Sequence, residues 1–283
     1  EMHLVAAIDH NPAVRPVLGL FEGVVSGAAD GYARMSGKSA ANLLHLGPGL
    51  GNAFANIHNA KKAFSPMINI VGDHASYHLK HNAPLTSDLD GLAKSSSDWV
   101  KRVTSPEQIT QCANDAWKAA NQSPGNIATL IVPADYAWSD IHTDLPKKVE
   151  LNNLKSVDNK LIEAAYKLLL KPNSMLYLGG KFLDEECLKF AAQIATKTGC
   201  RLVTDTFVSR IRRGAGLPIV QQVPYFSEMA EDFLQGTESI VFIGTKPPVS
   251  FFAYPGKKSF LSPDEAELFE LCSVEENGHE AWN

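Results

Sequence analysis

The sequence predicts an α/β protein with two doubly wound domains, each built around a parallel sheet. Apolar runs of strand length alternate with amphipathic stretches of helix length, a pattern typical of parallel strands that helices cover on both faces. The alternation fades in a polar segment, residues 139–158, and then begins again. The length of 283 residues is also close to that of two domains of roughly 150 residues each. We therefore expect one domain over residues 1–145 and a second over residues 146–283.

In the first domain, the apolar runs predict strands and the stretches between them predict helices. The strands are expected at residues 16–20, 41–45, 67–71 and 127–132, and the helices at 23–35, 51–64 and 106–121. A helical pattern over Met2, Val5 and Ile8 begins at once, with no N-cap residue or strand before it. This abrupt start predicts that the chain is cut at its beginning.

The second domain repeats the alternation. Strands are expected at residues 174–178, 201–204 and 239–243, and helices at 159–170, 184–198 and 227–234. Asp158 precedes the first of these helices and is a suitable N-cap. After Ile243 the chain is rich in proline, with two short strands expected near 258–261 and 268–271.

Composition and charge exclude several classes of partner. With 26 basic and 31 acidic residues the formal charge is −5, so nothing attracts the chain to nucleic acid or to an anionic membrane surface. The longest apolar runs, such as 67–71 and 127–132, are far shorter than the roughly 20 residues that span a bilayer. The four cysteines match neither a zinc site nor a dense disulfide framework. We expect free thiols and a cytoplasmic protein.

Glu22 is the first candidate for a functional residue. It follows the apolar run 17–21 and opens a helix rich in glycine and alanine, so it should lie at the carboxyl edge of the sheet, where ligands bind. A carboxylate beside Phe21 and Val24 suits proton chemistry. The alternative is an acidic residue that the helix dipole favours in a first turn.

A glycine-rich segment, residues 45–52, is the second candidate and lies at another strand-to-helix junction. Its three glycines would let the backbone approach a ligand, and the helix that follows favours an anion or a polar group. The spacing is neither that of a Walker loop nor that of the dinucleotide fingerprint. The alternative is a tight turn that needs flexible φ angles.

Three histidines, His74, His78 and His81, follow the strand expected at 67–71 with spacings of four and three residues. On a helix they would share one face, as metal ligands do. The glutamate of H-E-x-x-H is absent, so we assign no metal and expect either side chains that line a substrate cleft or a solvated loop.

The second domain offers weaker signals. Gly179 and Gly180 end a strand as a nucleotide-binding turn does, but the third glycine of the fingerprint is missing. Arg210, Arg212 and Arg213 would suit a phosphate, a solvated loop or a subunit contact.

Taken together, these junctions resemble thiamine diphosphate enzymes of the acetolactate synthase and benzoylformate decarboxylase type. The segments that carry the resemblance are 20–23, 27–34, 45–52 and 65–72 in the first half, and 213–216 and 251–256 in the second. The order and spacing of the Glu-to-Gly-Tyr-Ala-Arg helix and the Gly-Pro-Gly-x-x-Asn segment are specific to the pyrimidine-binding domain of this family. The second half resembles its Rossmann-like central domain.

The resemblance implies roles for individual residues. The family's glutamate, here Glu22, hydrogen-bonds N1′ of the cofactor aminopyrimidine and promotes the imino tautomer that activates the thiazolium for attack on a 2-oxo acid. His45 falls where benzoylformate decarboxylases have an active-site histidine. Gly47, Pro48, Gly49 and Asn52 match the cofactor-binding segment. His78 and His81 lie in the loop region where some decarboxylases carry adjacent histidines, although here Leu79 and Lys80 separate them. With His74 they are the candidates for the substrate pocket.

The departures from the family pattern matter as well. The family holds the diphosphate and Mg²⁺ in a third domain with a Gly-Asp-Gly motif, which this sequence lacks. We therefore expect that this domain and the first strand of the pyrimidine-binding domain are absent, and that the Mg²⁺ ligands lie elsewhere. No flavin is assigned. The resemblance implies a homodimer or homotetramer.

Two alternatives remain open. One is a truncated module that binds or dimerises without turnover. The other is a nucleotide-binding protein that uses the turn at Gly179 and Gly180.

Overall fold

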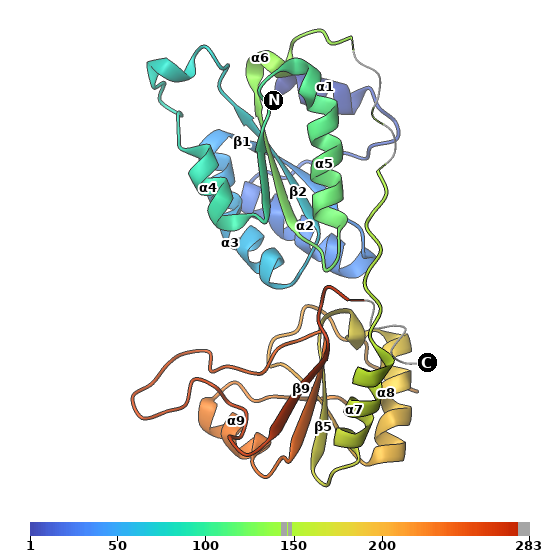
Figure 1. The fold of residues 1–283 in the computed structure, drawn as a ribbon. Helices are drawn as coiled ribbons and strands as arrows, with labels where there is room; N and C mark the ends of the chain where they lie inside the picture. Colours follow the sequence, from blue (N-terminus) through green and yellow to red (C-terminus); the bar gives the residue numbers. More distant parts are fainter. Residues whose placement is uncertain (143–145, 147–148, 277–283) are drawn as a thin grey trace. The chain divides into compact units, whose positions relative to one another are not determined.

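The computed structural model describes residues 1–142, 146 and 149–276. The chain divides into two compact units, residues 1–152 and residues 153–283. In the part of the chain that the structure describes, each unit contains one sheet, and all strand pairs of the two sheets are parallel (Figure 1). The predicted α/β class with two parallel sheets is confirmed. The predicted linker includes residues 143–145 and 147–148, which lie outside the described residues.

The first unit has a sheet of strand order β1-β2-β4-β3. Its elements are α1 (Met2–Asp9), α2 (Glu22–Ser36), β1 (Ala40–His45), α3 (Leu46–Lys62), β2 (Met67–Asp73), η1 (Leu79–His81), α4 (Leu89–Ser96), β3 (Trp99–Arg102), η2 (Pro106–Gln108), α5 (Ile109–Asn121), β4 (Ile127–Pro133) and α6 (Ala134–Ala137). The strands expected at 41–45, 67–71 and 127–132 are confirmed, whereas β3 and α4 were not predicted.

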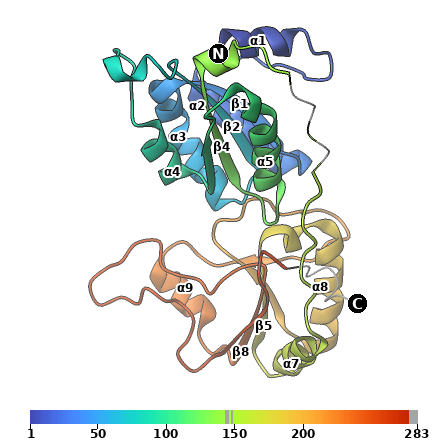
Figure 2. The same cartoon turned by 45° about the horizontal axis from the view of Figure 1, so that its top comes forward.

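Helices cover both faces of this sheet (Figures 1 and 2). On one face, Leu44, Met67 and Ile131 pack with buried side chains of α2, α3 and α4. On the other face, Cys112 of α5 packs with Leu130 of β4. Ala116, one turn further along α5, packs with Ala128 of the same strand. Because successive side chains of a strand point to opposite faces, continuous apolar runs are what such a doubly covered sheet requires.

The strand predicted at residues 16–20 is wrong. These residues have no helix or strand structure, and Leu18 and Leu20 are 88% and 95% exposed. A strand is held by a neighbouring backbone as well as by apolar side chains, and within the described residues the sheet ends at β1. Glu22 therefore begins α2 after an irregular segment and not after a strand.

The second unit has a sheet of strand order β7-β6-β5-β8-β9. Its elements are α7 (Asn159–Leu169), β5 (Ser174–Leu178), η3 (Gly180–Leu183), α8 (Glu185–Thr198), β6 (Arg201–Thr204), β7 (Gln221–Gln222), α9 (Ser227–Leu234), β8 (Ser239–Ile243) and β9 (Glu267–Cys272). The helices predicted in this unit and the strands predicted at 174–178, 201–204, 239–243 and 268–271 are confirmed, and Asp158 caps α7 by accepting a hydrogen bond from the Lys160 amide over 2.9 Å. The strand expected at 258–261 is wrong, because Phe260 forms only an isolated bridge with Val249.

Alternate side chains of β5 divide the core of the second unit. Leu176 and Leu178 pack on the face of α7 and α8, whereas Met175 and Tyr177 pack on the face of α9. All four cysteines are buried and none forms a disulfide, as predicted. Among the described residues, no helix is long and apolar enough to cross a lipid bilayer.

Candidate functional site

A pocket of about 230 Å³ lies where the carboxyl end of β1 meets the beginning of α2. It is lined by Glu1, Gly19, Leu20, Phe21, Glu22, Val25, Leu43, Leu44 and His45. Two residues singled out in the sequence, Glu22 and His45, therefore share one pocket. Its lining combines apolar side chains with the polar groups of Glu1, Glu22 and His45, and in small-molecule sites such polar groups fix the orientation of the ligand.

Glu22 is held by its neighbours in α3. Asn52 Nδ2 donates a hydrogen bond to Glu22 Oε2 over 3.1 Å. Asn56 Nδ2 donates to the Gly23 carbonyl over 2.6 Å, and the Ser26 hydroxyl donates to the Ala53 carbonyl over 3.3 Å. These bonds fix the start of α2 against α3, so the Glu22 carboxylate is half-buried and oriented.

Gly47 and Gly49 allow a close approach of neighbouring side chains, and none of the three glycines of residues 45–52 has a positive φ angle. α3 begins at Leu46, which itself has a φ of 52°, so the predicted helix start at residue 51 is five residues late. A Cβ at Gly49 would lie 3.1 Å from Glu22 Oε1, and a Cβ at Gly47 would collide with the Ser87 side chain. The tight-turn explanation of these glycines is therefore wrong. Pro48 is exposed in the first turn of α3, where a missing N–H costs nothing.

His45 is paired with a residue that sequence reasoning missed. Its Nδ1 lies 3.1 Å from Oε1 of Glu1, and the two side chains are 55% and 22% exposed. Glu1 precedes α1, 44 positions before His45, so no local spacing signals the contact.

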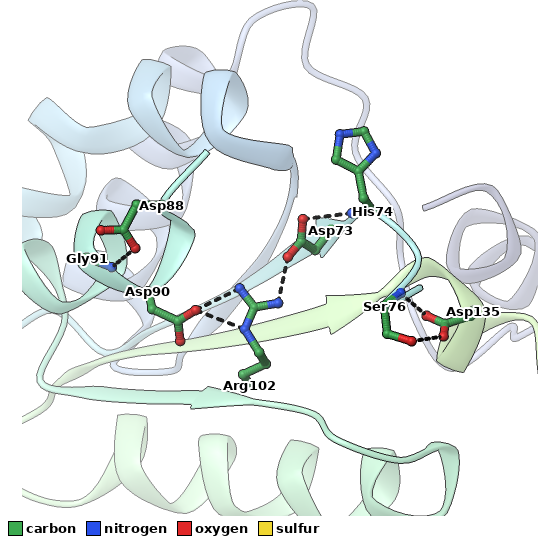
Figure 3. Close-up of polar contacts among 8 residues, drawn as sticks. All are labelled: Asp73, His74, Ser76, Asp88, Asp90, Gly91, Arg102 and Asp135. Atoms are coloured by element: carbon green, nitrogen blue, oxygen red, sulfur yellow. Dashed lines mark hydrogen bonds and ion pairs between the residues drawn. The ribbon is translucent and has the colours of Figure 1, made fainter. Parts of the chain in front are cut away.

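The carboxyl end of β2 carries a second polar group (Figure 3). Arg102 Nη1 donates to the buried Asp73 over 2.6 Å, and Arg102 Nε and Nη2 donate to Asp90 Oδ2 over 2.9 and 2.7 Å. Burial tends to lower the pKa of Arg102, but the hydrogen bonds and charges of both aspartates outweigh it and raise that pKa. This network ties β2, β3 and α4 together, and no signal in the sequence indicated it.

The three histidines lie beyond the same strand end and outside the residues that line the pocket. The ring centroids of His74 and His78, and those of His78 and His81, are 5.6 Å apart. The backbone amide of His74 donates a hydrogen bond to the Asp73 carboxylate. In Figure 3 the His74 ring points away from that carboxylate. The described residues contain no group of three or more His, Cys, Asp or Glu side chains that could hold a metal ion. A substrate-facing role for the histidines stays a prediction.

The glycine turn of the second unit is shaped by packing. A Cβ at Gly179 would approach the carbonyl oxygen of Gly244 to 2.8 Å, so this glycine lets two strand ends pack closely. The helix that follows begins with Glu185 and Glu186, and Asp184 caps it by accepting from the Cys187 amide over 2.9 Å. Acidic groups at a helix N-terminus are unfavourable for a phosphate.

The arginines of the second unit show no phosphate cradle either. The Arg213 guanidinium donates to the Gln222 side chain over 2.8 Å, and the Arg212 backbone amide donates to the Leu183 carbonyl over 3.1 Å. These contacts tie the loop after β6 to the unit itself.

Comparisons with known proteins show which family the first unit resembles. The model of the N-terminal TPP-binding domain of thiamine pyrophosphate enzymes matches residues 1–93. The protein designated acetolactate synthase large subunit IlvX of Mycobacterium tuberculosis is 45% identical over 275 residues, which are 96% of this chain and 52% of that protein. The acetolactate synthase large subunit of Corynebacterium glutamicum is 26% identical over 277 residues, 93% of this chain and 44% of that protein.

A solved structure shows the same fold. The thiamine diphosphate-dependent 4-hydroxybenzoylformate decarboxylase of Rhodococcus jostii RHA1 superposes with a TM-score of 0.83 at 22% identity, over 99% of this chain and 53% of that chain. This chain thus spans about half the length of the relatives that it matches. Residues 1–93 thus match the N-terminal TPP-binding domain of thiamine pyrophosphate enzymes, and the chain as a whole is similar to proteins named acetolactate synthase large subunit and benzoylformate decarboxylase.

Proposed function

We propose that the pocket at Glu22 receives the aminopyrimidine of thiamine diphosphate. The observation that carries the proposal is the arrangement of the Glu22 carboxylate. Oε2 is held by Asn52, whereas no hydrogen bond to Oε1 is seen within the described residues, and Glu22 lines the pocket. One carboxylate oxygen is therefore fixed by the protein, and the other is left to meet a ligand.

The residues present fit a flat ring with polar nitrogens on one edge. The pocket of about 230 Å³ has apolar side chains such as Phe21, Val25 and Leu44 in its wall, which suit the faces of the ring. Glu22 suits a ring nitrogen, because a carboxyl group can hold or accept a proton at that atom. Thiamine diphosphate itself supplies a thiazolium that accepts the electrons released when a bond beside a carbonyl breaks.

In this proposal each side chain has a limited task. Glu22 holds or moves a proton at N1′ of the aminopyrimidine, and Asn52 keeps the carboxylate in place. Gly47, Pro48 and Gly49 bring backbone close to the ring, and His45 offers an imidazole to the substrate end of the pocket. His74, His78 and His81 belong to the same proposal as side chains of the substrate pocket.

For the whole protein we propose a lyase or carboligase that acts on a 2-oxo acid and works as a homodimer or homotetramer in the cytoplasm. The names of the relatives, acetolactate synthase and benzoylformate decarboxylase, support this substrate class. Mg²⁺ and the diphosphate would be held by a further domain, since the sequence lacks a Gly-Asp-Gly motif. The boundary between the pyrimidine-binding and central domains at residues 145–146 is part of the same proposal.

The test is a titration of the ¹⁵N-labelled chain with thiamine diphosphate, followed by amide chemical shifts. We expect shifts at Glu22 and across residues 45–52, of similar size with and without Mg²⁺. A parallel titration with ADP serves as the comparison. Shifts confined to ADP and to the turn at Gly179 would favour a nucleotide-binding protein and would overturn the proposal.

A further inference from the structure

Glu1 lies across the ends of two neighbouring strands. Its Oε1 is 3.1 Å from His45 Nδ1, and His45, the last residue of β1, is in register with Gly72 of β2. Glu1 and His45 both line the pocket that contains Glu22. The contact therefore belongs to the pocket and not to a remote part of the surface.

Gly72 makes room for this contact. A Cβ built on Gly72 would collide with the carboxylate and the adjoining carbons of Glu1. The colliding atoms are the end of a flexible side chain, so an alanine at this position would displace the carboxylate and leave the strand in place. The absence of a side chain at Gly72 is thus a condition for the pairing of Glu1 with His45.

The pairing decides which imidazole nitrogen carries the proton. A neutral histidine has one N–H, and an acceptor beside Nδ1 places it there, so that Nε2 keeps a free lone pair. Within the described residues, the contact that the structure shows for the His45 ring is the one between Nδ1 and Glu1. We propose that Glu1 is a positioning residue, which fixes the tautomer and the orientation of His45 so that Nε2 meets the ligand.

This inference rests on the proposed function, in which the pocket receives a ligand. When Nε2 accepts a proton from a ligand, Nδ1 keeps its own proton and the carboxylate of Glu1 stabilises the positive imidazolium. The same division of tasks between a carboxylate and a histidine is common in proteins that use imidazole to move protons.

The test is the tautomer of His45, read from ¹⁵N chemical shifts of the labelled imidazole at alkaline pH and assigned with His45→Gln. We expect the Nδ1–H form in the wild type and in Glu1→Gln, whose amide oxygen accepts the same hydrogen bond. In Glu1→Ala and in Gly72→Ala we expect a change to the Nε2–H form, which free histidine prefers in water. Asp9→Asn removes one charge from the neighbouring helix and is the matched control.

An unchanged tautomer in Glu1→Ala would overturn the inference, and so would an equal change in Asp9→Asn. Circular dichroism of each variant reports whether it is folded, and Gly72→Ala provides a second variant that keeps the carboxylate. Thiamine diphosphate titrations of the same samples separate the two proposals. If Glu1→Ala changes the tautomer of His45 but thiamine diphosphate does not bind, the positioning role of Glu1 stands and the proposed function fails. If thiamine diphosphate binds but Glu1→Ala leaves the tautomer unchanged, the proposed function stands and the positioning role fails.

Discussion

Asn52 donates its side-chain amide to Oε2 of Glu22 over 3.1 Å, which joins the second turn of α3 to the first residue of α2. The bond is made between two residues 30 positions apart, of which Glu22 lines the pocket. It holds the carboxylate in one orientation before a ligand arrives. Such preorganisation reduces the conformational entropy that a ligand must overcome.

We expect Asn52→Ala to weaken binding of thiamine diphosphate about tenfold, because a hydrogen bond to a charged group contributes roughly 1.5–3 kcal/mol. The melting temperature should change little, since Asn52 is exposed. Isothermal titration calorimetry measures the affinity. Asn59→Ala, an exposed position in the same helix, is the control, and equal affinities of the two variants would contradict the prediction.

Gly49 and Gly51 form a matched pair in α3. A Cβ at Gly49 would lie 3.1 Å from Glu22 Oε1, whereas a Cβ at Gly51 would meet nothing within 4 Å. We expect Gly49→Ala to displace the carboxylate and lower the affinity for thiamine diphosphate at least tenfold. Gly51→Ala should keep the affinity and raise the free energy of unfolding by up to about 1 kcal/mol.

Calorimetry and urea unfolding of both alanine variants check this pair. Loss of affinity in Gly51→Ala, or full affinity in Gly49→Ala, would show that the approach of backbone to Glu22 does not shape the site.

A buried polar row crosses the core of the first unit. Asn42 Nδ2 donates to Asn69 Oδ1 over 2.9 Å, Asn69 Nδ2 donates to the Thr129 hydroxyl over 3.2 Å, and that hydroxyl is 2.7 Å from the one of Ser97. We expect Asn69→Leu to lower the free energy of unfolding by about 1–3 kcal/mol, because the Asn42 amide is left buried without an acceptor. Urea unfolding measures the free energy of unfolding of Asn69→Leu and of the control Asn59→Leu. Equal decreases in the two variants would show that the buried polar row does not stabilise the unit.

Cys272 predicts a dependence of stability on pH. Burial, reinforced by the charge of Glu276, raises the pKa of its thiol from 9.0 to about 11. The folded state therefore keeps a proton that the unfolded state loses, so this contribution is complete below pH 9 and is lost as the pH rises toward 11. We expect the free energy of unfolding to fall about 2–3 kcal/mol further over this interval in the wild type than in Cys272→Ala. The same dependence of the free energy of unfolding on pH in the wild type and in Cys272→Ala would contradict the prediction.

The elements that the sequence revealed are those with a strong local signal. β2 and β4 are largely apolar and mostly buried, β1 alternates between buried and more exposed positions, and the junction of β1 with α3 carries His45 and Asn52. The run that includes Leu18 and Leu20 has the same local pattern and fails, because it has no neighbouring backbone to pair with. Strand formation there depends on a partner that the run itself cannot supply.

The parts of the site that were missed depend on contacts between distant positions. Lys101 and Arg102 give β3 the composition of a polar loop. Only the fold shows that Arg102 donates a hydrogen bond to the buried Asp73, 29 positions away. The pairing of Glu1 with His45 needs the folded ends of β1 and β2. The periodicity of apolar residues predicts neither the Arg102–Asp73 contact nor the Glu1–His45 contact, because both depend on tertiary structure.

The central claim is that the carboxylate of Glu22 meets the aminopyrimidine, and the most direct test is the affinity of Glu22→Ala for thiamine diphosphate. Glu163→Ala, an exposed carboxylate of α7, controls for the loss of charge. Calorimetry should show a dissociation constant about ten to a hundred times higher for Glu22→Ala and unchanged for Glu163→Ala, as expected for loss of a hydrogen bond to a charged group. The same dissociation constant in Glu22→Ala and in the wild type would contradict the account.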